Sequence, residues 1–160
     1  MGRTPRKRAV QVGFTLLELV VVVAIAGTVM VLAVPGYFNH TSNQRTLSAA
    51  RTLAADLHVA QQEAVTRRAA VIVTFLGADA ACSAGQPTAS YVISGTSAVI
   101  KRTCLPPDVE WAPVPSSGLT FQSLGMPEAS FAVALHSRRT GLQHTVTVKA
   151  QTGNIADDTR

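Results

Sequence analysis

Residues 13–19 read Gly-Phe-Thr-Leu-Leu-Glu-Leu, and an apolar run follows them as far as Pro35. Between Phe14 and Val34 there are 21 residues, of which only Glu18 is charged. Because an α-helix rises about 1.5 Å per residue, roughly 20 apolar residues span the hydrocarbon core of a bilayer. Inside lipid every backbone amide must be paired within the segment, and a helix does this for a single span. The stretch therefore predicts one membrane-spanning helix.

Glu18 is the exception within this run. An ionisable side chain in an apolar span costs free energy unless another group partners it. Two interpretations are open from the residue alone. Either Glu18 has a functional partner inside the membrane, or it lies at the level of the lipid headgroups and has no role.

The sequence around Glu18 resembles the class III signal of type IV pilins and type II secretion pseudopilins. A basic leader precedes Gly13 and Phe14, Glu18 stands four residues after Phe14, and the valine-rich run ends at Pro35, where pilins commonly carry a helix-bending proline. In that family a membrane peptidase cuts after the glycine and N-methylates the next residue. The resemblance thus implies cleavage between Gly13 and Phe14, methylation of Phe14, and pairing of Glu18 with the terminal amine of a neighbouring subunit.

The position of the expected cut separates this chain from an ordinary secreted precursor. A secretory signal is cleaved after its apolar region, next to small residues. Residues 34–37 read Val-Pro-Gly-Tyr and do not form such a site. The remaining alternative is a plain single-span membrane-anchored domain, which would not be processed at Gly13.

The 160-residue chain carries a formal net charge of +5, but the charge is unevenly placed. Four of its 14 Lys and Arg residues lie in residues 3–8, so the remaining ten stand against nine acidic residues. A basic leader stays on the cytoplasmic side of a membrane. We therefore expect a single-pass inner-membrane protein in the lipid bilayer, with a cytoplasmic N-terminus and a periplasmic head, and the net charge is poor evidence for a nucleic-acid partner.

Cys82 and Cys104 are the only cysteines. An extracytoplasmic head permits a disulfide, and closing a loop of this length would stabilise the fold by about 3 kcal/mol. Two free buried thiols are the alternative. Neither Cys-x-x-Cys nor His-x-x-x-His occurs, so we expect no metal and no cofactor.

Apolar residues recur at spacings of three and four in residues 46–68, which indicates an amphipathic continuation of the helix. They are Leu47, Ala50, Leu53, Ala54, Leu57, Ala60 and Ala64. Charged residues of this segment, Asp56 among them, are expected mostly on its other faces. The apolar stripe must pack on something, and a sheet formed by the rest of the chain is the candidate.

Beyond residue 69 the pattern changes to short Val-rich and Ile-rich runs between Gly, Pro and Ser clusters, which predicts strands. The predicted strands are 70–76, 91–94, 98–103, 109–112, 119–122, 131–136 and 145–149, and residues 77–89 are expected to form a loop. The predicted fold class is α+β, a long N-terminal helix packed on an antiparallel β-sheet head. We expect a cleaved leader (1–13), a transmembrane and assembly helix (14–36), its amphipathic continuation (37–68) and a β-rich head (69–160).

Two later stretches look like the pattern shared by H-type minor pseudopilins and FimT-like minor pilins. Phe121 and Gly125 form a Phe-x-x-x-Gly turn, and Gly153 belongs to a Thr-Gly-x-hydrophobic motif. The resemblance implies a pilin-like fold and a non-catalytic subunit with a role in tip formation or initiation. Implied partners are other pilins or pseudopilins, the prepilin peptidase and methyltransferase, and the inner-membrane assembly platform. Secretion pseudopilus and type IV pilus share these features, so both remain open.

Some FimT-like minor pilins bind DNA through an arginine after that glycine. Here Asn154 takes its place, and Asp157 and Asp158 follow, which repel phosphate groups. The tail therefore argues against a DNA partner. The remaining basic candidates for a small DNA-binding patch, or for a solvated hairpin tip, are Arg138, Arg139 and Lys149.

No catalytic motif accompanies the four histidines of the chain, which are His40, His58, His136 and His144. A Gly-x-Ser-x-Gly, a His-Glu-x-x-His and a phosphate loop are all absent from the sequence. We therefore assign no catalytic residue, and we expect Trp111 to belong to the core or the sheet surface.

Overall fold

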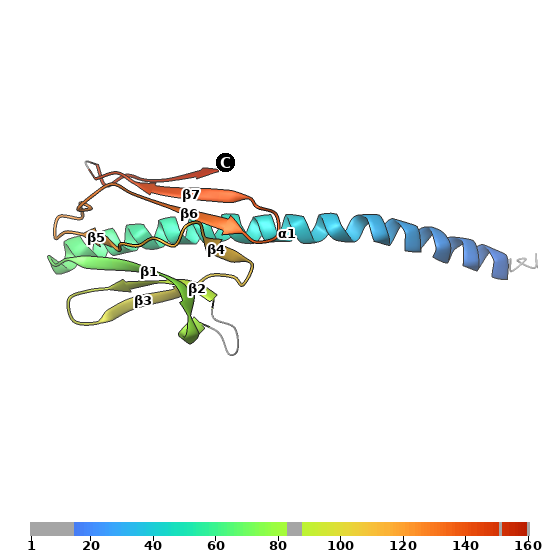
Figure 1. Cartoon of the computed structure of the whole chain (residues 1–160), viewed down its shortest axis with the longest axis horizontal. Coiled ribbons are helices and arrows are strands. Elements are labelled where there is room, and N and C mark those ends of the chain that lie inside the picture. Colours follow the sequence, from blue (N-terminus) through green and yellow to red (C-terminus); the bar gives the residue numbers. More distant parts are fainter. Residues whose placement is uncertain (1–14, 83–87, 151, 160) are drawn as a thin grey trace, which may run out of the picture. The chain divides into compact units, whose positions relative to one another are not determined.

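The computed structural model describes residues 15–82, 88–150 and 152–159 (Figure 1). The chain divides into two compact units, Met1–Tyr37 and Phe38–Arg160. Helix α1 (Leu16–Arg67) has 52 residues, includes Pro35 and contributes to both units. Its end at Arg67 agrees with the predicted boundary, and a basic residue there suits the negative end of the helix dipole.

In the described residues after α1, the chain forms eight strands and one short 3-10 helix. These are β1 (Val71–Asp79), η1 (Ala80–Cys82), β2 (Thr88–Ser94), β3 (Val99–Cys104), β4 (Val109–Trp111), β5 (Leu119–Phe121), β6 (Phe131–Ser137), β7 (Gln143–Val148) and β8 (Ile155–Thr159). The α+β prediction is confirmed. The strands, however, form two four-stranded antiparallel sheets rather than one: sheet A with the order β3-β2-β1-β5 and sheet B with the order β4-β6-β7-β8.

The two sheets arise because neighbours in sequence do not always pair. After β3 the chain leaves sheet A and forms β4, which pairs with β6, whereas β5 returns to sheet A beside β1. The periodicity of a strand shows which of its faces is buried, but does not identify its hydrogen-bonding neighbour.

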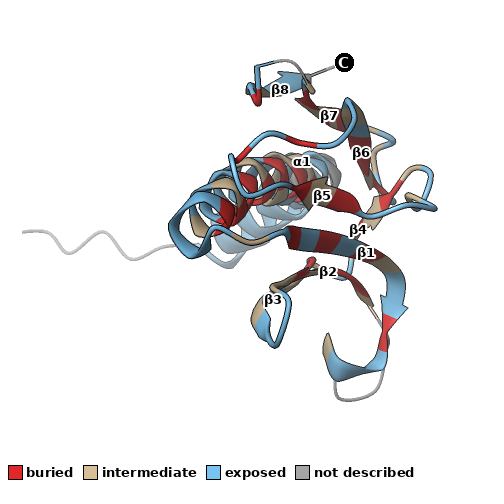
Figure 2. Cartoon of the chain, turned by 90° about the vertical axis from the view of Figure 1, so that its left-hand side faces the viewer, coloured by how far each residue is buried: buried red, intermediate tan, exposed pale blue. Residues whose placement is uncertain are grey.

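The second part of α1 forms the centre of the core. Ala50, Leu53, Leu57, Ala60 and Ala64 are fully buried, and Figure 2 shows this buried stripe facing buried residues of the strands. In the sheets, Val71 and Val73 of β1 and Val146 and Val148 of β7 alternate with more exposed residues. The apolar residues that recur every 3.6 positions in the helix and every two positions in the strands thus face one common interior.

Trp111 belongs to this core. Its ring centroid lies 5.2 Å from that of Phe75 in an edge-to-face arrangement, and its Nε1–H donates to the carbonyl oxygen of Leu76 at 3.0 Å. Because the indole N–H is paired, the large ring is buried without leaving a polar atom unsatisfied.

Two local predictions were wrong. Part of the expected loop 77–89 is strand, since β1 continues to Asp79 and β2 begins at Thr88, and these two residues are register partners. The C-terminal tail, for which no strand was predicted, forms β8 by pairing with β7 from Val148↔Ile155 to His144↔Thr159. In both places backbone pairing with a neighbouring strand outweighs a composition of small and acidic residues.

Candidate assembly site

Within the unit Met1–Tyr37, the described residues 16–31 expose their large apolar side chains. From Leu16 to Val31 the large apolar residues are 47% to 81% exposed. In the described part of the chain, α1 is the one helix long and apolar enough to cross a membrane, with a mean hydropathy of 2.7 over an 18-residue window of which nothing is buried. A surface of this kind needs lipid or other apolar helices around it.

The first turn of α1 has a cap that the sequence analysis missed. The Glu18 backbone N–H donates to Thr15 Oγ1 at 3.2 Å, and Glu18 itself is exposed. Thr15 followed three residues later by Glu18 has the spacing of a capping box, in which the hydroxyl satisfies a free N–H of the helix terminus. The spacing was visible in the sequence. Glu18 thus stands where the helix dipole favours a carboxylate, while Gly13 and Phe14 lie outside the described residues.

Cys82 and Cys104 form a disulfide with a Cα–Cα distance of 5.5 Å. The bridge joins η1 to the end of β3 and closes a loop of 22 residues in sequence separation. It thereby restrains the edge of sheet A beside a buried carboxylate, Asp79.

Asp79 accepts hydrogen bonds from three sides. The Ala81 backbone N–H donates at 2.9 Å, the Ser90 hydroxyl at 2.8 Å and the Arg102 guanidinium at 2.8 and 3.0 Å. These donors, with the Ala81 N–H as the largest cause, hold the pKa of Asp79 below its usual value. The end of β1 is therefore held by side chains from β2 and β3.

Asp56 connects α1 to sheet A, contrary to its expected place on a polar face of the helix. It is 5% exposed and accepts from Tyr91 Oη at 2.7 Å, Lys101 Nζ at 2.6 Å and Thr103 Oγ1 at 3.1 Å. Burial raises the pKa of Tyr91, and the neighbouring Asp56 carboxylate also raises it. The helical period of apolar residues predicts no buried carboxylate at this position. The three donors make its burial stable, because they satisfy the charged oxygens.

The two glycines of the later sequence motifs meet at one turn of α1. Gln61 Nε2 donates to the Gly125 carbonyl oxygen at 3.0 Å, and a Cβ on Gly153 would lie 2.6 Å from the same nitrogen. Both glycines have positive φ, of 76° at Gly125 and 61° at Gly153. Side chains at either position would be strained and would push the turns away from the helix.

A polar cluster holds α1 to sheet B near the start of the head unit. Ser42 Oγ donates to Asp108 Oδ2 at 2.9 Å and lies 2.9 Å from Ser137 Oγ, while Thr140 Oγ1 donates to Asn43 Oδ1. Together with Asp56 and Gln61, these contacts attach the head-unit part of α1 to both sheets and to the Gly125 turn.

The three basic candidates do not form one patch. Arg138 Nε lies 2.7 Å from Glu110 Oε2, and the guanidinium of Arg139 lies 5.5 Å from the ring centre of Phe38. Both stand between β6 and β7, whereas Lys149 follows the opposite end of β7. Lys149 is therefore the one of the three that stands beside Gly153, whose N–H donates to the Lys149 carbonyl oxygen, and Asp157 and Asp158 are exposed on the adjoining β8.

The histidines are also dispersed. His40 and His58 are exposed on α1, His136 Nδ1 lies 3.5 Å from Glu110, and His144 is buried on β7. Among the residues that the structure describes, no three His, Cys, Asp or Glu side chains gather in a way that would hold a metal ion.

Comparison with known proteins gives a matching family model and two structures with a similar fold. The family model of type II transport protein GspH matches residues 49–152. The structure is similar to the type IV minor pilin FimU of Pseudomonas aeruginosa strain PAO1, with a TM-score of 0.54 and 20% identity over 74% of this chain and 91% of that one. It is also similar to the minor pseudopilin EpsH of the type 2 secretion system of Vibrio cholerae, with a TM-score of 0.51 and 14% identity over 72% of this chain and 97% of that one. No curated protein sequence matches the chain.

The two structural similarities, at 20% and 14% identity, show a shared fold. The family match extends over more than half of the chain and covers the buried part of α1, both sheets as far as β7 and the turn before β8. The chain therefore belongs to the family of type II transport protein GspH.

Proposed function

We propose that the chain is made as an inner-membrane precursor and is incorporated, after processing, into a type II secretion pseudopilus or a type IV pilus. The observation that carries this proposal is the exposed apolar surface of residues 16–31 on the same helix that forms the core of a GspH-type head. This segment is apolar enough for lipid before assembly, and in a filament it has neighbouring helices to contact.

The proposed maturation follows the sequence motif. The peptidase removes residues 1–13 by cutting after Gly13, and the methyltransferase modifies Phe14. Residues 14–36 then serve as transmembrane and assembly helix, residues 37–68 continue it, and the head of residues 69–160 is periplasmic. The cut removes the basic cluster but leaves the apolar span, so the protein stays anchored.

Assembly depends on two kinds of contact. The apolar side chains of the span pack against equivalent helices, and the Glu18 carboxylate pairs with the terminal ammonium of Phe14 in an adjacent subunit. The Thr15 cap supports this role because it starts α1 immediately after Phe14, which places Glu18 in the first turn. In a low-dielectric filament core, either charge without its partner is costly. The assembly platform adds the subunit, whose proposed place is at the tip or the initiating end.

No catalytic role is part of this proposal, since the family is a structural one. DNA capture as in some FimT-like pilins gains no support from the head, because Arg138 is already paired with Glu110 and acidic β8 lies beside the Gly153 turn. A gel shift at low salt with the full chain tests that alternative directly, because phosphate contacts are strongest there.

The decisive experiment for the main proposal is intact-mass measurement on protein from cells that contain the processing peptidase. The expected mass is that of residues 14–160 plus one methyl group. A Gly13→Val variant serves as the control and should retain the full-length mass. A wild-type protein that still begins at Met1 would reduce the molecule to a tethered domain and refute the proposal.

A further inference from the structure

The hairpin between β6 and β7 is attached to the first residues of the head unit. The head unit begins at Phe38, and the hairpin carries Arg139 and Thr140 at its tip. The Arg139 guanidinium lies 5.5 Å from the centre of the Phe38 ring, and the Thr140 hydroxyl donates to Asn43 Oδ1. Figure 1 shows the turn that joins β6 to β7 beside α1. These contacts place Arg139 next to the residue at which the head begins.

The backbone of the hairpin is tied to the core of the head. The Gly141 N–H donates to the Ser137 carbonyl oxygen at 2.9 Å, which closes the turn around Arg139. Ser137 itself is fully buried, and its hydroxyl lies 2.9 Å from that of Ser42 on α1. A side chain on a backbone held in this way loses little conformational entropy when it binds a partner.

The head begins only a short distance after the apolar run. Phe38 follows Val34, the last residue of that run, by four residues. Four residues span at most about 14 Å when extended and about 6 Å in a helix. The headgroup layer on each side of the hydrocarbon core is roughly 5–8 Å thick. If residues 14–34 cross the membrane, Phe38 therefore lies at or just outside the level of the lipid headgroups.

The Phe38 ring and the guanidinium above it suit this level of the membrane. The ring remains 50% exposed, and Tyr37 precedes it in the sequence. Aromatic side chains gather at the boundary between lipid and water, where one part of the side chain is in an apolar and another in a polar environment. A guanidinium above an aromatic ring can still donate the N–H groups at its edge to an oxygen acceptor.

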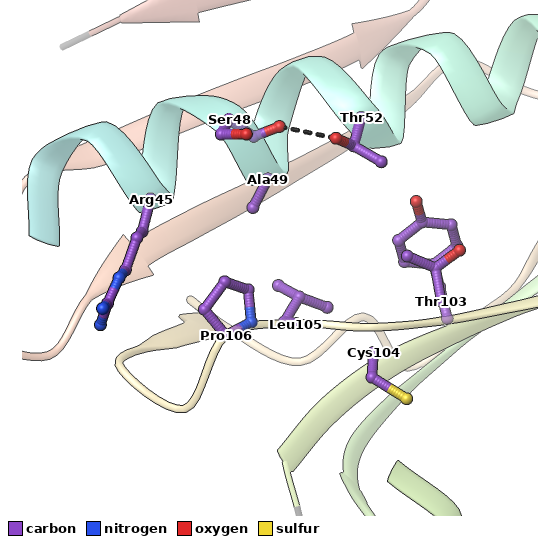
Figure 3. A pocket seen from close by; sticks show the side chains of 9 residues that line it. Arg45, Ser48, Ala49, Thr52, Thr103, Cys104, Leu105 and Pro106 are labelled. Atoms are coloured by element: carbon purple, nitrogen blue, oxygen red, sulfur yellow. Dashed lines mark hydrogen bonds between the residues drawn. The ribbon is translucent and has the colours of Figure 1, made fainter. Parts of the chain in front are cut away.

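Arg139 differs from two other arginines near this end of the head. Arg138 Nε lies 2.7 Å from Glu110 Oε2. Arg45, which Figure 3 shows at one end of a pocket beside α1, lies 3.6 Å from Asp108 Oδ2. Arg139 is exposed, and the ion pairs formed among the described residues do not include it. Its guanidinium is therefore open to an anion from outside the chain.

We propose that Arg139 binds the phosphate group of a phospholipid in the membrane from which the head emerges, with the Phe38 ring in the headgroup layer beside it. The planar fork of the guanidinium matches two oxygens of one phosphate. One open arginine suits a single lipid headgroup, whereas nucleic-acid binding depends on several phosphate contacts. The contact rests on the proposed function, because it requires residues 14–36 to span the membrane. It holds the head at the bilayer surface before assembly.

The test uses the full chain in vesicles of phosphatidylethanolamine and phosphatidylglycerol. A fluorescent bimane is attached to Gln143→Cys, an exposed position next to the hairpin, without reductant because Cys82 and Cys104 form a disulfide. A sterol with a nitroxide at headgroup level quenches the dye when the hairpin lies on the bilayer. In vesicles of digalactosyl diacylglycerol, which has no phosphate, quenching should fall by a factor of about three or more.

Two variants on the same hairpin lose the same charge. Arg139→Gln should lower the quenching in phospholipid vesicles by a factor of about three or more, because the phosphate loses its donor. Arg138→Gln is the matched control and should leave the quenching unchanged, since Glu110 already holds that side chain. Trp111 fluorescence should show the same unfolding transition in both. Equal losses in the two variants, or equal quenching with and without lipid phosphate, would overturn the proposed lipid contact.

Flotation of the vesicles separates this outcome from a failure of the proposed function. A chain that floats with the vesicles, but whose quenching does not depend on Arg139, refutes the lipid contact alone. A chain that the vesicles do not carry has no membrane anchor and refutes the proposed function itself.

Discussion

The two parts of helix α1 differ in the exposure of their apolar side chains. In the first unit, Leu16 to Val31 stay largely exposed, and nothing in the described chain covers them. In the head unit, the stripe from Ala50 to Ala64 is fully buried against the two sheets. One helix thus leaves its apolar side chains exposed at one end and buries them within the head at the other.

The composition of each part explains the difference. Apart from Glu18, the first part is apolar on all sides and is rich in Val and Leu, as suits a helix surrounded by lipid or by other helices. The second part has an apolar stripe with three fully buried alanines, a size that lets strands approach the helix closely. The first part should therefore control assembly, and the second should control the stability of the head.

The largest expected effect comes from truncating the buried stripe. Leu57→Ala should lower the free energy of unfolding of the head by about 2–5 kcal/mol, through lost burial and the cavity left behind. Trp111 is the single tryptophan and lies in the core, so its fluorescence reports unfolding of the head. Leu19→Ala removes the same atoms from the span and should leave this transition unchanged. Equal effects of the two variants would contradict the division of roles.

The disulfide is a restraint that belongs to the head alone. The double variant Cys82→Ser, Cys104→Ser should lower the free energy of unfolding by about 3 kcal/mol, because the unfolded chain regains the freedom of the closed loop. Urea denaturation followed by Trp111 fluorescence measures this change. Membrane insertion should be unaffected, and an unchanged urea midpoint would show that the bridge does not restrain the unfolded state.

A substitution at Glu18 tests whether the membrane-spanning segment makes contacts between subunits. Glu18→Gln should reduce recovery in sheared filaments at least tenfold, equivalent to about 1.4 kcal/mol, because the partner ammonium loses its counter-charge. Cleavage after Gly13 and the Trp111 transition should stay normal. Glu63→Gln, which removes a half-buried carboxylate paired with Arg67 from the other part of α1, is the control and should assemble as wild type does. Normal filament recovery of Glu18→Gln would rule out the pairing.

The smallest expected effect is a pH dependence at Asp79. Since the folded pKa lies below the ordinary value of 3.8, the charged carboxylate contributes stability above that pH and loses it as the pH falls through the folded pKa. The stability difference between wild type and Asp79→Asn should therefore be full at neutral pH and shrink below about pH 4. Asp157→Asn, on exposed β8, controls for the loss of one carboxylate. A difference that persists unchanged at pH 2 would contradict this origin.

Much of the helix was predictable from the sequence alone. The apolar run, the change to a stripe after residue 46 and the end near Arg67 all depend on residues close together in the chain. The positions of most strands were predictable for the same reason, because a two-residue period is local. Thr15 was missed although its three-residue spacing from Glu18 was visible.

Only the tertiary structure decided which segments meet. It placed β4 beside β6 and β5 beside β1, made a strand of residues 155–159, and gave the buried Asp56 its three donors from β2 and β3. It also brought Gly125 and Gly153 to the same glutamine, Gln61. The physical reason is the range of the interactions: helix periodicity and span length follow from neighbouring residues, whereas strand pairing and the partners of a buried carboxylate depend on residues distant in sequence.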